Sequence, residues 1–316
     1  MPGRRIVIAL GGNAIIPVGA SGTYYDQYQV TKGTMRQVAS LAAAGSQIVV
    51  THGNGPVVGN IVLRNDAGYE KYGIPPMPLF VCGADSQGGL GYMIQQNLQN
   101  AMLLQGLDIP VATVVTQVQV ERDDPAFANP TKPIGPFYTE EQARALAERF
   151  GWTVVEDAHR GWRRVVPSPR PHRVVELEVI RRLIEAGVVV IACGGGGVPV
   201  VTCEENRLEG IDAVIDKDRA SALLAEKIGA DTLVIVTQVE KVCRDFGTDR
   251  EQPLDELPVA EAERLLAAGQ FPPGSMGPKI ESAVAFLRSG GRMVLITDPP
   301  HLEAAIHGEA GTRLVP

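Results

Sequence analysis

The chain has 316 residues, of which 45% are hydrophobic and 21% are charged, as is typical of a globular protein that buries a sizeable core. Its net charge of −7 argues against a nucleic-acid partner, because binding to a phosphate backbone requires a basic face. No apolar stretch approaches the length of a membrane span, and no cleavable signal peptide is expected ahead of the first strand, so we expect a cytoplasmic protein without a membrane partner.

Three glycine-rich turns each follow a run of β-branched and aliphatic residues, at 6–10, 48–52 and 188–192. Short apolar runs bounded by glycine predict buried strands of a parallel sheet, and ligands bind beyond the carboxyl ends of such strands. Because glycine has no Cβ, backbone N–H groups in these turns can approach an anion closely. The three turns therefore predict a site that handles phosphate.

Strand-like runs alternate with helical stretches along most of the chain, which is typical of βαβ units. In the first half the pattern predicts a helix over 26–44 that ends at Gly45, a long helix over 85–105 and a strand over 111–120. In the second half it predicts helices over 173–186, 219–228, 258–268 and 279–288, and strands over 232–237 and 292–297, the latter as the last clear strand.

Residues 121–172 interrupt this alternation. The stretch over 121–138 is dense in proline, and a capping box at Thr139 and Gln142 then predicts a short helix that ends at Gly151. A structured excursion of this length predicts an arm or lid. Its arginines could gather an anionic substrate, but we favour a solvated, mutually repelling face made of Arg160, Arg163, Arg164, Arg170 and Arg173.

Three lysines lie in loops rich in glycine or proline, namely Lys132, Lys217 and Lys279. Phosphoryl transfer depends on positioning and on positive charge directed at the oxygens of the transferred group. We therefore take these three lysines as candidate catalytic cations. The alternative for any one of them is a solvated surface lysine.

Asp216 and Asp218 flank Lys217 directly after a strand-like run. Such carboxylates could hold the lysine, orient reactants, or meet Mg²⁺ through water. The alternative is that an aspartate caps the following helix, and the two explanations can apply to different residues here.

Other motifs are absent or weak. The P-loop pattern GxxxxGK followed by Ser or Thr is missing, and a GxGxxxG turn over 53–59 lacks the second strand and acidic residue of a dinucleotide site. The four cysteines show no metal-binding or redox spacing, so we interpret them as thiols of a reduced protein. His52 is interpreted as a packed neighbour of the second turn and not as a base.

These motifs resemble those of carbamate kinases, members of the amino-acid-kinase superfamily, from about residue 5 to the end. The matching segments include Leu-Gly-Gly-Asn-Ala at 10–14, Thr-His-Gly-Asn-Gly-Pro at 51–56, Asn-Pro-Thr-Lys-Pro-Ile-Gly-Pro-Phe-Tyr at 129–138, Ala-Val-Ile-Asp-Lys-Asp at 213–218 and Pro-Gly-Ser-Met-Gly-Pro-Lys at 273–279. The Asn-Pro-Thr-Lys segment and the arginine- and proline-rich arm are the most specific of these features.

The resemblance implies an α/β fold, a three-layer α/β/α sandwich around a mainly parallel open sheet, formed by a single domain over 1–316. An N-lobe over about 1–205 would hold carbamate or carbamoyl phosphate, with a protruding subdomain over 121–172, and a C-lobe over about 206–316 would hold ATP or ADP. The implied reaction is a direct in-line transfer between ATP and carbamate with Mg²⁺, which no protein side chain ligates directly. A homodimer is the implied assembly.

The resemblance also implies a role for each candidate residue. Lys132 would reach in from the arm, while Lys217 and Lys279 would neutralise phosphate charge and Asp218 would orient them. The acceptor and the transferred phosphoryl group would be cradled by Gly11, Gly12, Asn13, Gly53, Asn54 and Gly55. The nucleotide would be bound by Gly195, Gly196, Asp216 and Met276, with the loop over 242–247 beside it.

Two positions near the acceptor side depart from the family pattern. Val57 stands where glutamine is usual, and Asp85 stands where an apolar residue is common. They leave open a related kinase that uses another small carboxylate or carbamate-like acceptor. A nucleotide-binding sensor with weak catalysis is a further alternative, although a pure binder has less need of three lysines at the transfer point.

Overall fold

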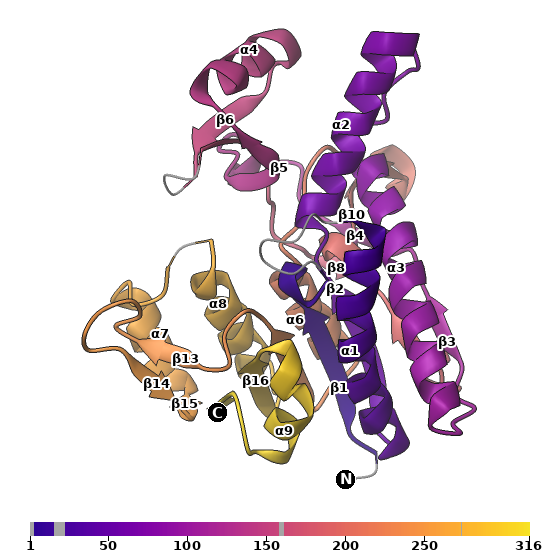
Figure 1. Cartoon of the computed structure of the whole chain (residues 1–316), viewed down its shortest axis with the longest axis vertical. Coiled ribbons are helices and arrows are strands. Elements are labelled where there is room, and N and C mark those ends of the chain that lie inside the picture. The colour runs from indigo at the N-terminus through magenta and orange to yellow at the C-terminus, as the bar shows by residue number, and fades with distance from the viewer. Residues whose placement is uncertain (1–2, 16–22, 158–160, 273) are drawn as a thin grey trace.

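The computed structural model describes residues 3–15, 23–157, 161–272 and 274–316, apart from the side chain of Asn13. In this part of the chain, eight strands form one sheet in the order β15-β17-β16-β12-β1-β2-β9-β3 (Figure 1). Their bounds are β1 Arg5–Leu10, β2 Gln47–His52, β3 Val111–Thr113, β9 Val189–Ile191, β12 Thr232–Val236, β15 Glu256–Pro258, β16 Met293–Thr297 and β17 Thr312–Val315. All neighbouring strands are parallel except β16 and β17, which confirms the mainly parallel sheet.

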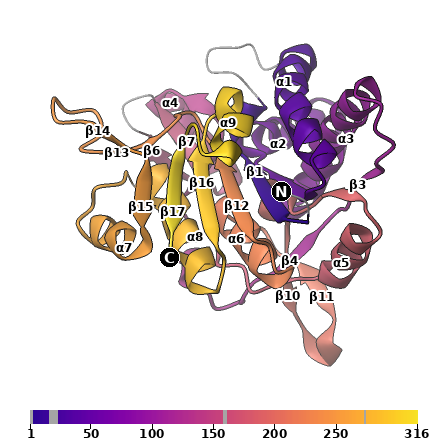
Figure 2. The ribbon, with the colours of Figure 1, turned by 90° about the horizontal axis from the view of Figure 1, so that it is seen from below.

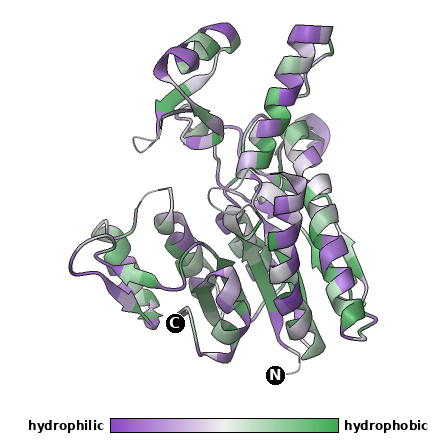
Figure 3. Cartoon of the chain, in the orientation of Figure 1, coloured by the Kyte–Doolittle hydropathy of each residue, from purple (hydrophilic) through white to green (hydrophobic). Residues whose placement is uncertain are grey.

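Helices cover both faces of this sheet, as the predicted sandwich requires. Alternate side chains of β1 enter two separate cores, with Ile6, Ile8 and Leu10 on one face and Val7 and Ala9 on the other. The first core is completed by α1 (Tyr24–Ala43), α3 (Leu79–Leu104) and α9 (Leu302–His307). The second is completed by α5 (Leu177–Glu185), α6 (Lys217–Lys227), α7 (Val259–Ala267) and α8 (Met276–Arg288) (Figure 2). In Figure 3 the central strands are mostly hydrophobic, whereas the helices also carry hydrophilic stretches.

A second unit stands apart from the large sheet. It contains β5 (Lys132–Tyr138), β7 (Trp162–Val166) and β6 (Thr153–Glu156), paired in that order, together with α4 (Glu140–Phe150). The predicted capping box is confirmed, since Thr139 caps α4 and Gly151 ends it in a left-handed conformation. In Figure 1 this unit lies at the top left, facing the raised end of α2 (Gly55–Tyr72).

The remaining strands are short. A four-stranded sheet has the order β11-β10-β4-β8, and β13 pairs with β14. Their bounds are β4 Gln117–Gln119, β8 Arg173–Val174, β10 Val198–Thr202, β11 Leu208–Gly210, β13 Val242–Arg244 and β14 Gln252–Leu254.

The predicted strand over 111–120 is wrong as a single element. Its two ends, β3 and β4, belong to different sheets. Between them, the side chain of Gln87 on α3 accepts a hydrogen bond from the Thr116 amide (2.8 Å) and donates to the Thr116 carbonyl (3.0 Å). This buried side chain forms the two hydrogen bonds with the Thr116 backbone that a neighbouring strand would otherwise form. The chain can therefore pass from one sheet to the other at this residue.

Three other expectations also need correction. The helix predicted from 173 begins at Leu177, because the first two residues of the range pair in β8. The helix predicted over 85–105 begins at Leu79, six residues earlier. The strand over 292–297 is not the last one, because β17 follows it. In addition, the sequence pattern did not predict α2.

The arginines of the arm do not form one solvated face. Arg163 donates to the carbonyl of Gly135 (2.9 Å) and pairs with Asp157 (3.2 Å), and its side chain is largely buried. The guanidinium of Arg164 lies 4.6 Å from the centre of the Trp152 ring, and burial lowers its pKa. Arg170 and Arg173 are exposed, as predicted, while Arg160 lies outside the described residues.

No helix in the described ranges combines the length and apolar character that crossing a membrane would need.

Candidate active site

The first two glycine turns lie side by side at the carboxyl edge of the sheet, because β1 and β2 are neighbours in register. Gly53 donates its amide to the carbonyl of Leu10 (3.0 Å), and Gly11 donates to the carbonyl of Val236 (2.9 Å). A Cβ on Gly11 would lie 2.6 Å from that Val236 oxygen, so only glycine fits. The strand order changes direction at β1, which has β2 on one side and β12 on the other, and such a point is a usual binding crevice.

The three candidate lysines come together beside these turns through two aspartates. Lys132 Nζ lies 2.6 Å from Asp216 Oδ2, and Lys279 Nζ lies 3.0 Å from Asp218 Oδ2. Lys217 pairs with the other oxygen of Asp218. The five residues form what we call the lysine–aspartate cluster. None of the three lysines is therefore an isolated surface cation.

The side chains of the lysine–aspartate cluster come from the arm and from the starts of α6 and α8. Asp216 caps α6, since its Oδ1 accepts the amides of Asp218 (2.9 Å) and Arg219 (3.3 Å). Lys217 is the first residue of α6, and Lys279 lies in the first turn of α8. The positive ends of both helix dipoles add to the charge of the lysines at this point.

A buried hydroxyl pair ties α6 to the sheet. Thr51 Oγ1 on β2 lies 2.6 Å from Ser221 Oγ, which donates to the carbonyl of Lys217 (2.6 Å). A Cβ added to Gly53 would meet Lys217 Cδ at 3.2 Å, so the lysine stem lies directly against the second glycine turn. The Thr51–Ser221 link was not foreseen, because the two residues are 170 positions apart and are brought together only by the fold.

Electrostatics keep the cluster charged. Burial alone would raise the pKa of both carboxyls, but Lys132, Lys217 and Lys279 hold the pKa of Asp216 well below its usual range. Lys217 and Lys279 likewise lower the pKa of Asp218. For Lys217 burial is the stronger influence and lowers its pKa, while the charge of Asp218 opposes this. With three cations facing two anions, the cluster has an excess positive charge that suits phosphate.

The third glycine turn packs against the second. A Cβ on Gly195 would lie 2.3 Å from Asn54 Nδ2, and one on Gly196 would lie 2.2 Å from the carbonyl oxygen of Ile215, next to Asp216. Asn54 Nδ2 in turn donates to Ser86 Oγ on α3 (2.8 Å). The turn thus holds Asn54 in place. Ser86 is not among the predicted site residues, because its link to Asn54 is made only by the fold.

The other predicted residues lie around this centre. Gly12 begins a 3-10 helix (η1, Gly12–Ala14), and Gly55 is the first residue of α2. Met276 is the first residue of α8, three positions before Lys279, and is partly buried. The side chain of Asn13 lies outside the described part of the structure.

His52 is a buried neighbour of the site. Its side chain is 1% exposed, Nδ1 lies 3.0 Å from the carbonyl oxygen of Gly53, and the ring packs against Gly194. Burial lowers its pKa to about 4, so the imidazole is neutral at pH 7. The prediction that His52 is a packed neighbour is thus consistent with its surroundings.

This burial makes stability sensitive to acid. His52 binds a proton in the unfolded chain below its ordinary pKa of 6.5 but in the folded protein only near 4. The contribution of His52 to the free energy of unfolding is therefore fully present above pH 6.5. It falls by about 3 kcal/mol as the pH drops from 6.5 to about 4. We expect His52→Asn, which can retain the hydrogen bond to Gly53, to lose correspondingly less unfolding free energy between pH 7 and pH 4. Urea titrations at both pH values measure this, and equal losses in both proteins would contradict it.

Known proteins with similar sequences and structures cover the whole chain. A model described as the amino acid kinase family matches residues 4–298. A carbamate kinase from Pyrococcus horikoshii is 49% identical over 313 residues, covering 99% of each chain, and the carbamate kinase-like protein YahI from Escherichia coli is 48% identical over 311 residues, covering 98% of each. A carbamate kinase from Giardia lamblia bound to citric acid superposes with a TM-score of 0.92 at 42% identity, covering 99% of this chain and 98% of that one.

Proposed function

The chain belongs to the amino acid kinase family, and from that premise we propose that it is a carbamate kinase. The enzyme transfers a phosphoryl group reversibly between ATP and carbamate, giving ADP and carbamoyl phosphate. The observation that carries this conclusion is the convergence of Lys132, Lys217 and Lys279 on two aspartates beside the paired glycine turns.

The chemistry needs little beyond positioning and charge. Carbamate is already an anionic nucleophile, so a direct in-line transfer requires no strong base. This agrees with the surroundings of His52, which is buried and held neutral. The lysines would draw two anionic reactants together and stabilise charge on the oxygens of the transferred group.

Each half of the site has its own proposed task. The amides of Gly11 and Gly53 donate to strand carbonyls and so hold the two turns in place, while the amides of Gly12 and Gly55, with Asn13 and Asn54, would cradle the acceptor and the transferred group. Lys132 would approach from the arm, which would close over the acceptor end. Lys217 and Lys279, oriented by Asp218, would neutralise the nucleotide phosphates.

The nucleotide would lie over the C-lobe, about 206–316, and the acceptor over the N-lobe, about 1–205. Met276 lies at the start of α8, close in sequence to Lys279, and would line the nucleotide pocket with the loop over 242–247. Gly195 and Gly196 would bind the nucleotide together with Asp216, because Gly196 packs against Ile215, the residue before Asp216.

Mg²⁺ fits this arrangement as a companion of the nucleotide. Both oxygens of Asp216 and of Asp218 already have lysine or amide partners, so neither carboxylate offers a free pair of oxygens. The ion would be held by phosphate oxygens and water and would supply further positive charge on the transferred group.

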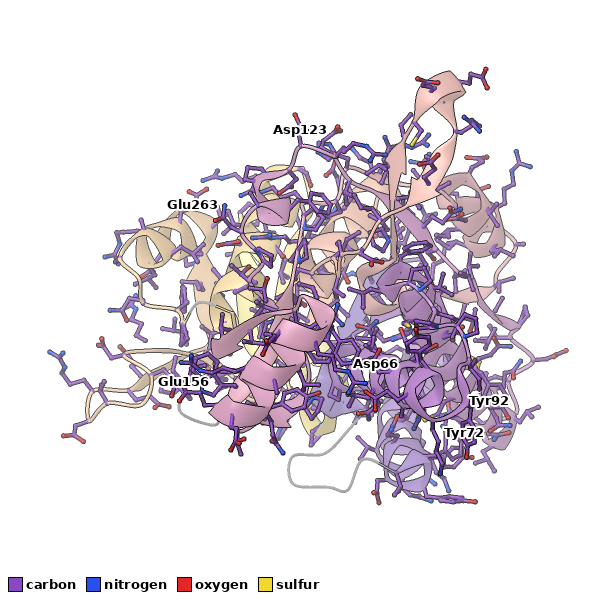
Figure 4. All side chains as sticks on the ribbon, turned by 90° about the horizontal axis from the view of Figure 1, so that it is seen from above. Asp66, Tyr72, Tyr92, Asp123, Glu156 and Glu263 are labelled. Carbon is purple, nitrogen blue, oxygen red and sulfur yellow. The ribbon has the colours of Figure 1, made fainter. Side chains whose placement is uncertain are left out.

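The assembly is proposed to be a homodimer. Along α1 and α3, large apolar side chains are exposed at Tyr24, Tyr25, Tyr92, Leu103 and Leu104. Tyr92 lies on the same side of the molecule as Tyr72 of α2 (Figure 4). An exposed apolar surface of this kind suits a second copy of the chain, and a monomer mass in sedimentation would contradict the assignment.

The free thiols of Cys82, Cys193, Cys203 and Cys243 fit a reducing compartment, and the cytoplasm is the proposed location.

A panel of phosphoryl donors tests the acceptor. With ADP and Mg²⁺, carbamoyl phosphate is expected to give ATP with a kcat/KM at least ten times that of acetyl phosphate or other acyl phosphates. Val57 is partly buried against the core and the side chain of Asp85 is exposed, so neither departure removes a cradle group. A preference for another acyl phosphate would retain the phosphoryl-transfer site and replace carbamate as the acceptor.

A further inference from the structure

α2 begins in the loop that is proposed to bind the acceptor. Asn54 precedes the helix, Gly55 is its first residue, and Gly59 lies four residues further on, about 6 Å along the helix axis. Any shift of α2 along or across its axis therefore moves the loop over 53–55 as well.

Gly59 lies against the backbone of the arm. A Cβ at this position would be 2.2 Å from Gly135 Cα and 2.4 Å from Gly135 N. Both atoms are backbone, so no side chain could rotate away to make room. The contact therefore fixes how closely β5 approaches α2, and only glycine on the helix permits this distance.

Gly135 is itself held in place. It has a φ of +73° and lies where the register of β5 against β7 shifts between Ile134 and Tyr138. Arg163 on β7 donates to its carbonyl oxygen (2.9 Å) and is anchored by Asp157 (3.2 Å). The arm thus presents a rigid surface to the helix at this position.

The seam between α2 and the arm continues on both sides of this contact. Val58 of α2 shares a small buried cluster with Ile134 and Val166 of the arm. Near the other end of the helix, Glu70 pairs with Arg149 of α4 (2.8 Å). In Figure 1 both the arm and the raised end of α2 lie above the large sheet.

Lys132 lies three residues before Gly135, at the start of β5, and its Nζ reaches across to Asp216. We propose that Gly59 is a positioning residue that sets the distance between the acceptor loop and the Lys132 ammonium, by way of its backbone contact with Gly135. The inference rests on the proposed function, because it concerns where Lys132 stands when the phosphoryl group is transferred. A displacement of about 1 Å at such a group can cost 10²-fold in rate.

Gly59→Ala tests this directly. The added methyl group pushes the arm from the helix, so kcat for ATP formation from ADP and carbamoyl phosphate should fall about 10- to 100-fold. The KM for ADP should stay within about two-fold, because the nucleotide side does not touch this contact. Rates are expressed per ADP-binding site, titrated calorimetrically, so that a misfolded fraction does not count as slow catalysis.

The matched control is Gly68→Ala on the same helix, where the nearest atoms to a Cβ belong to the Ile74 side chain at 4.0 Å. It should keep wild-type kcat. In a Lys132→Ala background, assayed at high enzyme concentration, Gly59→Ala should cost little more, because both changes act on one group. If Gly59→Ala does not fold, Arg163→Lys, which releases the Gly135 carbonyl, should show the same dependence on Lys132.

Two results would overturn the positioning role. One is a kcat for Gly59→Ala within two-fold of wild type, and the other is an equal further loss of rate in the Lys132→Ala background. A wild-type protein that makes no ATP would instead refute the proposed function, so the two failures are distinguishable.

Discussion

Lys217→Ala is expected to lower kcat by about 10²- to 10³-fold, the usual loss when a preorganised group that stabilises transition-state charge is removed. The side chain of Lys217 is 12% exposed, lies against Gly53 and pairs with Asp218. Water cannot readily replace its charge in such a site. Asp218 keeps Lys279 as a partner, so the loss of unfolding free energy should stay below the roughly 3–5 kcal/mol that an uncompensated buried charge costs.

The matched control is Lys227→Ala, which removes the same side chain from the other end of α6. Lys227 is exposed and pairs with its neighbour Glu226 (2.7 Å), so both kcat and stability should stay close to wild type. Steady-state assays and urea titrations of the three proteins separate catalysis from folding. Near-wild-type turnover in Lys217→Ala would remove this lysine from the transfer site.

Lys132→Ala is expected to have a similar effect on kcat, about 10²- to 10³-fold, by a different route. The change removes the ammonium that the arm brings to the cluster and leaves Asp216 Oδ2 without its 2.6 Å partner. An unpaired carboxylate would then repel the phosphoryl oxygens that the lysine is proposed to attract. Because Asp216 is buried and loses its main counter-charge, the change should also lower the free energy of unfolding, so rates are expressed per ADP-binding site.

Arg144→Ala is the control for the arm. Arg144 is a solvent-exposed cation on α4 that pairs with Glu140, and it takes no part in the cluster. Its removal should leave kcat unchanged. A comparable loss of rate in Arg144→Ala and Lys132→Ala would mean that the general charge of the arm matters and not the position of Lys132.

The central strands and their glycine turns were predictable because their signals are local. β1, β2 and β9 are short apolar runs that a glycine turn follows, so their positions can be read from the chain alone. Lys132 and Lys279 were identifiable because prolines and glycines lie beside them, but the structure places all three lysines at the starts of β5, α6 and α8 and not in loops. The resemblance placed Asp218 with Lys217 and Lys279, but it did not reveal the pairing of Lys132 with Asp216, because these two residues are joined only by the fold.

The errors have tertiary causes. Arg163 and Arg164 were read as solvated, but packing within the arm and against α2 buries them, and that contact cannot be seen in the arm's own sequence. α2 was missed because Gly55, Gly59 and Gly68 weaken its helical signal. The strand over 111–120 breaks because a glutamine from α3 binds its centre.

The most direct test of the account is ATP formation by the wild-type protein from ADP and carbamoyl phosphate in the presence of Mg²⁺. We expect rapid ATP production that stops when carbamoyl phosphate is omitted and that Lys132→Ala reduces about 10²-fold or more. A protein that binds ADP but forms no ATP from carbamoyl phosphate would contradict it.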